Sequence, residues 1–439
     1  MADTAYQDPV PAAEIGALFD RLWPIHRSIT GPGVRETHDI LGEILPLNRM
    51  EIPTGTNVFD WTVPQEWRCH GAHITGPDGQ RIADVATNNL HLVGYSVPFR
   101  GVLARDELDA HLYSLPEQPD AIPYVTSYYT PRWGFCLPHA QRQALPDGQY
   151  DVVVDTELVD GALTLSEAVL EGESEDEILF STYTCHPSMA NNELSGPIVA
   201  ALLYRRLAAL PRRHFTYRFA FLAETIGALA YLNARGDLLR ERLKAGYVVT
   251  CVGDDGPYTY KHSRAGNTLA DRAARHALEH LVPAERIRYL DFDPSDGSDE
   301  RQYGSPGFDL PVGSLSRTIY AAFPQYHTSL DNRDFVSFDA LSDSIEAYVR
   351  ICQVLEANGT FENLVKFGEP NLGKRGLYPT MGGAQTVEHD VRCLLWLLNQ
   401  SDGTQDLLAI AARSGLPIDG LRQQAERCLD ASILAEVTG

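Results

Sequence analysis

The chain has 439 residues, of which 44% are apolar and 22% charged, enough to bury a core in two or three domains of ordinary size. Its 59 acidic residues outnumber its 36 basic ones, which gives a formal net charge of −23 at pH 7. A chain this acidic repels phosphate backbones and anionic lipid, so we expect neither nucleic acid nor a membrane as its main partner.

The cysteines and the start of the chain indicate a cytoplasmic protein. The seven cysteines are scattered, odd in number and free of C-x-x-C spacing, which argues for reduced thiols and against both a disulfide framework and a thiolate zinc site. The first residues, MADTAYQDPVPAAE, show neither the basic start nor the apolar run of a secretory signal. No apolar stretch approaches the ~20 residues that span a bilayer.

The first part of the chain predicts two helices and then a small β domain. Residues 13–44 carry apolar side chains at helical spacing on both sides of a Gly-Pro-Gly turn. From residue 51 to 150, short β-type runs such as GAHITG and LHLVGY alternate with turn signals, which predicts an inserted, mostly β domain. Its SYYTPRWGF segment (127–135) holds an aromatic cluster that either roofs a pocket or forms the small core of that domain.

Residues 151–370 carry the most regular pattern of the chain. Runs rich in Val, Phe and Tyr, such as QYDVVVDTEL, EILFSTYTC and TYRFAFLAE, predict strands. SGPIVAALLYRRLAAL and IGALAYLNARGDLLRERL, which lie between or after them, predict helices. This alternation predicts an α/β sheet with helices on both faces, and we assign residues 1–50 to the same domain.

Residues 380–439 predict three short helices around a Ser-Gly turn, typical of a helix-turn-helix or winged-helix module. From residue 381 onward, eight acidic side chains face four basic ones, a net charge of −4. A helix that reads DNA needs a positive face to bind phosphate. We therefore expect this module to contact protein, including a second copy of the chain in a homo-oligomer. A transcription regulator with a sensory domain is the less favoured alternative.

Chemistry-bearing side chains stand where predicted strands end. His186 follows ILFSTYT, Glu224 follows YRFAFLA, and Asp254 follows VVTCVG, while His327 lies in the loop QYHTSLDNRDF. Ligands of open α/β sheets bind at the carboxyl ends of strands, and histidines with carboxylates make zinc sites. Each residue alone has a plainer structural explanation, but four at one edge predict a metal site. Asp331 could hydrogen-bond the far nitrogen of His327.

The series of motifs resembles that of the cocatalytic zinc aminopeptidases. The chain shows a strand-terminal His, then ANNELSG before a helix, then AETIG, GSD and YHTSLD. That family has a His before a G-A-x-D-N-x-S-G block, a Glu-Glu pair before a Gly, and finally S-D and H-T-x-x-D. The match over residues 150–350 implies a zinc-exopeptidase-like mixed sheet flanked by helices. The flanking segments resemble a bacterial aminopeptidase-like group with an inserted small β domain and a C-terminal winged helix.

The resemblance implies a role for some residues, whereas other positions lack the carboxylate that the family has there. His186 and His327 match the first and last histidine ligands of the family, and Glu224 matches the general base that activates the metal-bound water. Asn192, however, replaces the aspartate that bridges two zinc ions, and Thr225 replaces a glutamate ligand. A further aspartate of the family corresponds to Thr250, with Asp254 displaced a few residues onward.

The missing carboxylates predict one zinc ion per chain instead of two. Two Zn²⁺ ions ~3.5–4 Å apart need negative charge between them, which a neutral amide does not supply. Two histidines and one carboxylate still make an open three-ligand site. Glu193 is the first candidate for that carboxylate and Asp254 the second, although Glu193 could equally be an ordinary acid at a helix start. Asp254 and Asp299 are also candidates to bind substrate, and the alternative for Asp299 is a solvated turn residue.

These residues predict a zinc-dependent hydrolase that cleaves an amide bond of a small peptide or an aminoacylated metabolite. The inserted domain would restrict the site to small substrates. The same metal and Glu224 would also serve an acyl-transfer or cyclising enzyme, in which an internal amine replaces water. Asn192 and Thr225 leave a third possibility, a catalytically impaired binding or scaffold protein.

Overall fold

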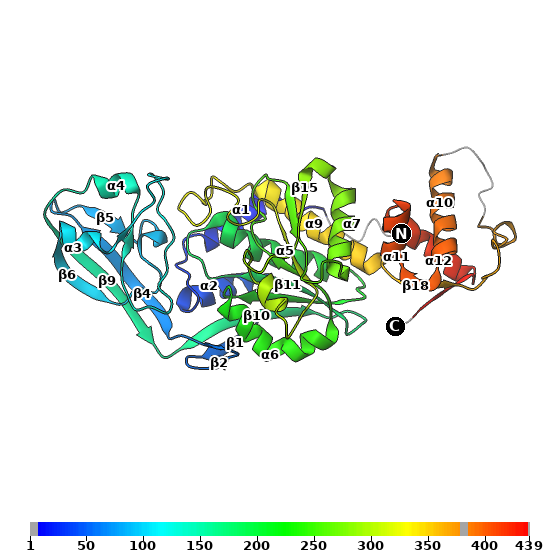
Figure 1. The fold of residues 1–439 in the computed structure, drawn as a ribbon, viewed down its shortest axis with the longest axis horizontal. Coiled ribbons are helices and arrows are strands. Elements are labelled where there is room, and N and C mark those ends of the chain that lie inside the picture. Colours follow the sequence, from blue (N-terminus) through cyan, green and yellow to red (C-terminus); the bar gives the residue numbers. More distant parts are fainter. Residues whose placement is uncertain (1–7, 378–384, 438–439) are drawn as a thin grey trace. The chain divides into compact units, whose positions relative to one another are not determined.

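The computed structural model describes residues 8–377 and 385–437, which form two compact units (Figure 1). The first unit runs up to Ala270 and includes Glu285–Glu346. The second contains Asp271–Ala284 and the chain from Ala347 onward. In the part of the chain that is described, no helix combines the length and the apolar composition needed to cross a bilayer.

An eight-stranded mixed sheet forms the centre of the first unit. Its order is β1 (Asn48–Pro53), β10 (Ala162–Leu170), β12 (Thr216–Leu222), β11 (Glu177–Tyr183), β13 (Leu243–Val249), β16 (Val312–Ser316), β14 (Tyr258–Lys261) and β15 (Ile287–Leu290). Strands β12, β11, β13 and β16 run parallel to one another. Every residue of β11 and β12 is buried, as expected of strands covered on both faces. Their carboxyl ends therefore meet at one edge of the sheet.

Helices cover both faces of this sheet, as the alternating sequence pattern predicts. Helix α5 (Ser195–Ala208) connects β11 to β12, and α6 (Ile226–Arg242) connects β12 to β13. These two crossovers run in opposite directions along the sheet, so their common right-handedness places α5 and α6 on opposite faces. Helices α1 (Ala12–Leu22) and α2 (Pro32–Leu41) pack beside α5. The predicted α/β fold class is confirmed.

The inserted domain is built on a four-stranded antiparallel sheet. Its order is β5 (Arg81–Asp84), β4 (Glu66–Thr75), β9 (Gln149–Val159) and β6 (Phe99–Ala104). Smaller elements complete it: β7 (Leu112–Tyr113), β8 (Phe135–Cys136), α3 (Arg105–Asp109) and α4 (His139–Gln143). Strands β2 (Asn57–Val58) and β3 (Trp61–Thr62) form a separate hairpin that contacts α6. The insertion ends later than residue 150, because β9 pairs with β4 and β6 and the chain rejoins the central sheet only at β10. The alternating burial of β9 fits a sheet packed on one face.

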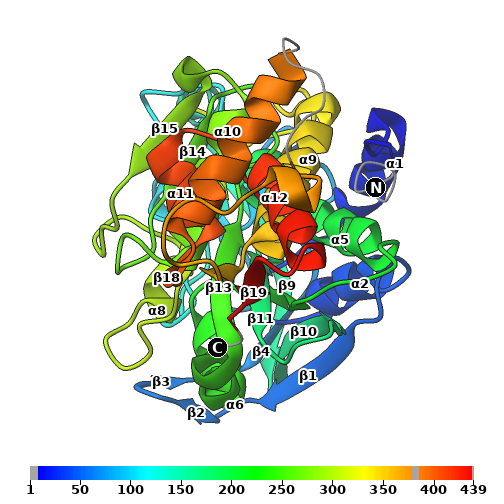
Figure 2. The ribbon, with the colours of Figure 1, turned by 90° about the vertical axis from the view of Figure 1, so that its right-hand side faces the viewer.

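The second unit contains three helices and a three-stranded sheet. The helices are α10 (Gln385–Gln400), α11 (Leu407–Ser414) and α12 (Ile418–Asp430), and Figure 2 shows them in orange and red. The sheet has the order β18 (Asp402–Asp406), β17 (Thr360–Asn363) and β19 (Leu434–Glu436). Because β17 belongs to this sheet, the module begins before residue 380, the start that the sequence predicts. Residue 380 lies in the segment 378–384, outside the described residues. Helices α7 (Leu269–Leu281) and α9 (Phe338–Ala357) begin in the first unit and end in the second.

Candidate active site

His186 is fixed by contacts on the Nδ1 side of its ring, which faces the protein interior. It follows β11, and its side chain is 4% exposed. Its Nδ1 lies 2.8 Å from Oε2 of Glu193, and its carbonyl oxygen accepts a hydrogen bond of 3.0 Å from Nε of the buried Arg27. These contacts fix the ring so that Nε2 faces the other way.

Glu193 reaches His186 because the chain makes a π-helical turn, η2 (Ala190–Leu194), before α5 begins. Such turns are rare and concentrate at functional sites, and amphipathic periodicity does not reveal them. The Glu193 side chain is fully buried, which raises the pKa of its carboxyl group. Its Oε1 and Nη2 of Arg27 have no hydrogen-bond partner in the described structure.

Glu224 occupies the opposite side of the His186 ring. Its Oε2 lies 3.6 Å from Nε2 of His186, and its Oε1 accepts a hydrogen bond of 2.9 Å from Oγ of Ser298. The next residue, Thr225, has φ 62° and ψ −77°, and the amide of Ile226 donates to the Glu224 carbonyl at 2.8 Å. This is a γ-turn, a strained conformation for a β-branched residue, and it aims Glu224 into the pocket at the end of β12.

Asp299 lies directly beneath this turn, in the loop before α8 (Glu300–Tyr303). Its Oδ1 accepts the Thr225 amide at 2.7 Å, while its Oδ2 has no partner among the described residues. Complete burial, together with the nearby charge of Glu224, raises the pKa of Asp299 well above its ordinary value and favours its protonated form. The alternative of a solvated turn residue is therefore wrong.

His327 faces the same pocket from the loop after β16. Its φ of 54° is unusual for a residue other than glycine. The ring stacks on Tyr326 at a centroid distance of 3.9 Å, and its centroid lies 5.5 Å from that of His186. Its Nε2 is buried without a hydrogen-bond partner in the described structure, and burial and the charge of His186 lower its pKa to about 3. The ring is thus neutral at ordinary pH.

Asp331 does not support His327 in the way that the sequence suggests. Its two carboxylate oxygens accept the amides of Asn191 and Asn192, at 2.7 and 2.9 Å. These amides start the π-helical turn and its helix, where backbone donors have no partner within the helix. The prediction that Asp331 bonds His327 is wrong, because the helix start uses both of its oxygens.

Asp254 is also committed to structural hydrogen bonds. Its carboxylate accepts from Nδ2 of Asn191 at 2.9 Å, from Oγ1 of Thr318 at 2.7 Å, and from the amides of Gly256 and Thr318. It is absent from the lining of the pocket that contains His186 and Glu224. The structure therefore gives Asp254 a role in joining loops instead of one at the pocket.

Asn192 and Thr250, where the resemblance would place carboxylates, take part in a network of uncharged contacts. The backbone oxygen of Asn192 accepts from Oγ1 of Thr250 at 3.0 Å, and Nδ2 of Asn192 lies 3.8 Å from Sδ of Met189. The Tyr183 hydroxyl lies 2.5 Å from the same Thr250 oxygen. This uncharged network supplies nothing to offset the repulsion between two cations.

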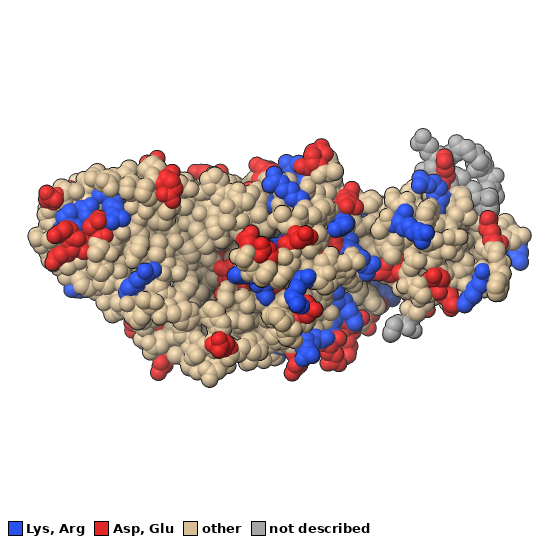
Figure 3. All heavy atoms as spheres, viewed as in Figure 1, with Lys and Arg blue, Asp and Glu red and all other residues tan. Residues whose placement is uncertain are grey.

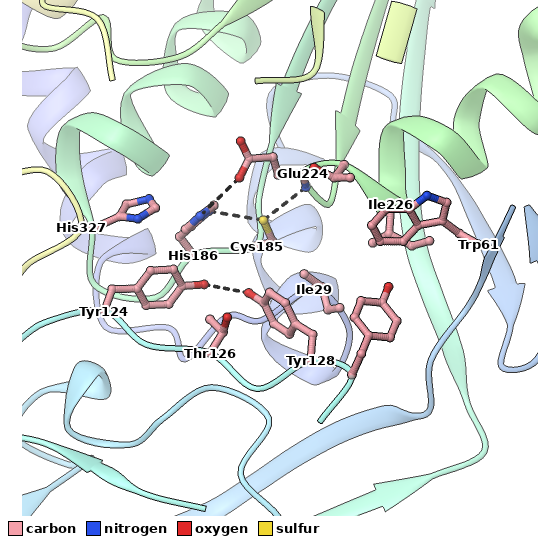
Figure 4. A pocket seen from close by; sticks show the side chains of 12 residues that line it. Ile29, Trp61, Tyr124, Thr126, Tyr128, Cys185, His186, Glu224, Ile226 and His327 are labelled. Atoms are coloured by element: carbon pink, nitrogen blue, oxygen red, sulfur yellow. Dashed lines mark hydrogen bonds and ion pairs between the residues drawn. The ribbon is translucent and has the colours of Figure 1, made fainter. Parts of the chain in front are cut away.

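A cavity of about 350 Å³ joins these side chains (Figure 4). The sheet edge contributes Cys185, His186, Glu224, Thr225, Ile226 and His327, the inserted domain contributes Tyr124, Thr126, Tyr128 and Tyr129, and the β2–β3 hairpin contributes Trp61. The two interpretations of SYYTPRWGF both hold. Tyr128 and Tyr129 line the cavity, whereas Trp133 is buried and stacks on Phe99 with a centroid distance of 4.2 Å.

Among the described residues, one group of three metal-type side chains has its ligand atoms within 4.8 Å of one another: Cys185, His186 and Glu193. It lies on the Nδ1 side of His186, and burial raises the pKa of the Cys185 thiol to about 11, which disfavours the thiolate that binds metals. His327 is not in this group. The structure thus brings His186 together with Glu193 behind the ring, and with Glu224 and His327 in front of it.

Several residues of the site have no clear signal in the sequence. Arg27 is 159 positions from His186, and an isolated arginine does not reveal that it is buried. Trp61 sits in a two-residue strand, too short for a periodic pattern. Ser298 precedes a predicted acid, but nothing in the sequence links its hydroxyl to Glu224.

Comparison with known proteins connects this geometry to a family. A sequence-family model described as a domain of unknown function, DUF4910, matches residues 17–358. The chain belongs to the DUF4910 family. A winged helix-turn-helix model matches residues 359–436 of this DUF4910 protein, which confirms the predicted winged helix and agrees with the early start of the module at β17.

Two similar proteins come from the bacterium Clostridium acetobutylicum. The DUF4910 protein is 43% identical over 413 residues, 94% of each chain, to a Clostridium acetobutylicum protein whose name assigns it provisionally to polysaccharide biosynthesis with an aminopeptidase-like domain. A crystal structure from that organism, provisionally called a peptidase, is 41% identical over 97% of this chain and 96% of that chain, with a TM-score of 0.90.

More distant structures share the fold. A zinc aminopeptidase from Bacillus subtilis is 12% identical over 79% of this chain and 95% of that chain, with a TM-score of 0.57. A peptidase M28 precursor from Shewanella amazonensis is 13% identical over 81% and 95%, with a TM-score of 0.55. The resemblance to the zinc-aminopeptidase fold is confirmed.

Proposed function

We propose that this DUF4910 protein is a zinc-dependent, aminopeptidase-like hydrolase that cleaves an amide bond of a small peptide or an aminoacylated metabolite. The observation that carries the proposal is the meeting of His186 Nε2 and Glu224 Oε2, 3.6 Å apart, in a cavity where the buried Nε2 of His327 has no partner among the described residues. The aminopeptidase-like name of the Clostridium relative supports it.

The histidines fit one metal ion. A buried imidazole nitrogen without a hydrogen bond is costly unless a ligand binds it, and neutral imidazole is a preferred ligand of zinc. His186 and His327 would hold the ion on the pocket side. Glu193 would keep Nδ1 of His186 occupied, as carboxylates behind metal-bound histidines do, and we assign it this positioning role in place of direct ligation. When bound, zinc polarises the amide carbonyl and lowers the pKa of water.

Glu224 is placed to move the protons of the reaction. Its carboxylate takes a proton from the attacking water as the new C–O bond forms, and passes it to the nitrogen as the C–N bond breaks. Ser298 fixes one oxygen of Glu224, which leaves the other free to face the substrate. The raised pKa of Asp299, caused by its burial and by the nearby charge of Glu224, disfavours a second negative charge beside Glu224.

Metal analysis tests the proposal. Purified protein dialysed against zinc should hold about one ion per chain, and His186→Ala and His327→Ala should each abolish stoichiometric binding while the fold persists by circular dichroism. The loaded protein should hydrolyse members of a panel of aminoacyl amides, dipeptides and N-acylated amino sugars. The sugars belong in the panel because the name of the Clostridium relative concerns polysaccharide biosynthesis. A folded protein without zinc under these conditions would refute the proposal and favour a scaffold.

We also propose that the winged-helix module contacts protein, including a second copy of the chain. Within the module, Arg413, Arg422 and Arg427 donate to Gln400, Glu426 and Gln424, so these cations are already engaged. On the face shown in Figure 3, basic and acidic side chains are interspersed. Phe367 is 98% exposed. Sedimentation velocity should show an oligomer that Phe367→Ser weakens, and duplex DNA at low salt should not bind; a monomer would contradict this.

A further inference from the structure

The end of the cavity away from His327 is aromatic and open to solvent. Figure 4 shows Trp61 and Ile226 on one side of His186 and Glu224, and His327 on the other. The Trp61 and Tyr129 side chains are 40% and 55% exposed, and their ring centroids lie 5.8 Å apart at an interplanar angle of 72°. Tyr and Trp are enriched at binding surfaces because each combines a large apolar ring with a hydrogen-bonding group, so two such rings beside a cavity suit a ligand.

The walls of the cavity carry little charge. Among its described lining residues none is Lys, Arg or Asp, and Glu224 is the one carboxylate. A free amino terminus on the substrate would thus find no counter-charge except Glu224, which the reaction uses, and a substrate carboxylate would find no lysine or arginine in the lining. Polar partners are instead hydroxyls: those of Tyr124 and Tyr128, 2.7 Å apart, and that of Thr126. The substrate is therefore expected to be uncharged, rich in hydroxyl groups, and acylated on its nitrogen.

We propose that the site takes an N-acylated amino sugar, with the sugar ring against Trp61 and Tyr129 and the amide at His186 and Glu224. A pyranose presents C–H groups on one face, which pack against an aromatic ring, and hydroxyls at its edge, which the tyrosines can bond. The cavity of about 350 Å³ is at the size expected for one small ligand. This inference rests on the proposed amide hydrolysis and names its substrate.

The reaction balances without any additional reactant. Water adds to the acyl carbon, the bond from that carbon to the sugar nitrogen breaks, and the proton removed from water goes to the nitrogen. The products are a carboxylic acid and a free amino sugar. No oxidant or nucleotide is needed.

Binding measurements separate this inference from the hydrolase proposal. The test uses zinc-treated Glu224→Gln protein, because this substitution removes turnover. Isothermal titration calorimetry measures the Kd of N,N′-diacetylchitobiose and of leucinamide for this protein. We expect the disaccharide to bind more tightly than leucinamide, and Trp61→Ala or Tyr129→Ala to raise its Kd at least tenfold. Phe59→Ala is the matched control, because Phe59 is 52% exposed beside the same short strands but does not line the cavity. It should leave the Kd within twofold.

Each outcome decides one of the two proposals. Disaccharide binding that Trp61→Ala abolishes, in a protein that holds no zinc and hydrolyses nothing, keeps the sugar site and rejects the hydrolase. Hydrolysis of leucinamide without disaccharide binding rejects the sugar site alone and points to a peptide. Equal Kd values for Trp61→Ala and Phe59→Ala also reject it. Release of acetate from the disaccharide by the wild-type protein, reduced at least tenfold by Trp61→Ala, supports both.

Discussion

The buried carboxylates at this edge of the sheet fall into two groups that differ in how completely the protein bonds them. Asp254 and Asp331 accept hydrogen bonds on both oxygens. Glu193 and Asp299 are equally buried, yet each keeps one oxygen without a partner in the described structure. Leaving a buried polar atom unpaired costs about 1–3 kcal/mol. The unpaired atoms, with Nε2 of His327, therefore mark the part of this edge that is kept for binding and chemistry.

The difference also shows how the first group serves the second. Asp331 holds the amides that begin the π-helical turn, and Asp254 holds the Asn191 side chain within it. Once fixed in this way, the turn positions Glu193 within hydrogen-bonding distance of His186. Changes in the bonded group should therefore act mainly on stability, and changes in the unpaired group mainly on metal binding and turnover.

Replacement of the general base gives the largest expected effect. Glu224→Gln keeps the shape of the side chain and its bond from Ser298 but removes the proton acceptor, so kcat should fall by about 10²–10⁴. Zinc content, measured by atomic absorption, should stay at the wild-type value. Activity within tenfold of the wild type would show that another group moves the proton.

Asp331 should make stability fall as pH rises. Burial raises the folded-state pKa of Asp331 from 3.8 to about 6, so between these values the unfolded chain has lost the proton and the folded chain keeps it. Rising pH then favours the unfolded chain, and the stability present below pH 4 is lost by about pH 6, by up to about 3 kcal/mol. Urea unfolding from pH 4 to 7 should show that the free energy of unfolding declines less in Asp331→Asn than in the wild type, by this amount. Parallel curves for both proteins would contradict the assignment.

Glu193 and Asp254 make a direct comparison between the two groups. Glu193→Gln weakens the support behind His186 and should lower zinc affinity by about 10–100-fold, as loss of such partners does. Asp254→Asn should leave zinc affinity unchanged and lower the free energy of unfolding by about 1–3 kcal/mol. Competition with a chromophoric chelator measures the first, and urea unfolding the second. The comparison fails if Asp254→Asn weakens zinc as much as Glu193→Gln.

The sequence predicts the parts of this site that follow from sheet topology. His186 and Glu224 end neighbouring parallel strands, so their meeting follows from recognising β11 and β12. What the sequence does not predict depends on local backbone irregularity or on distant contacts. Glu193 is placed by a π-helical turn. The apolar alternation of β9 suits either sheet, so the sequence predicts it in the central sheet although it pairs with β4 and β6. The hydrogen-bond partners of Asp331 likewise depend on which backbone amides have no other acceptor in the folded chain.

The strained turn at Thr225 offers the smallest effect and separates stability from function at one residue. Its φ of 62° is unfavourable for a β-branched side chain, so Thr225→Gly should relieve strain and raise the free energy of unfolding by about 1 kcal/mol. The same change loosens the segment that aims Glu224, so kcat should fall several-fold while KM changes little. Thr225→Ala keeps the strain and is the control. A glycine variant that is more stable and equally active would show that the strain does not serve to aim Glu224.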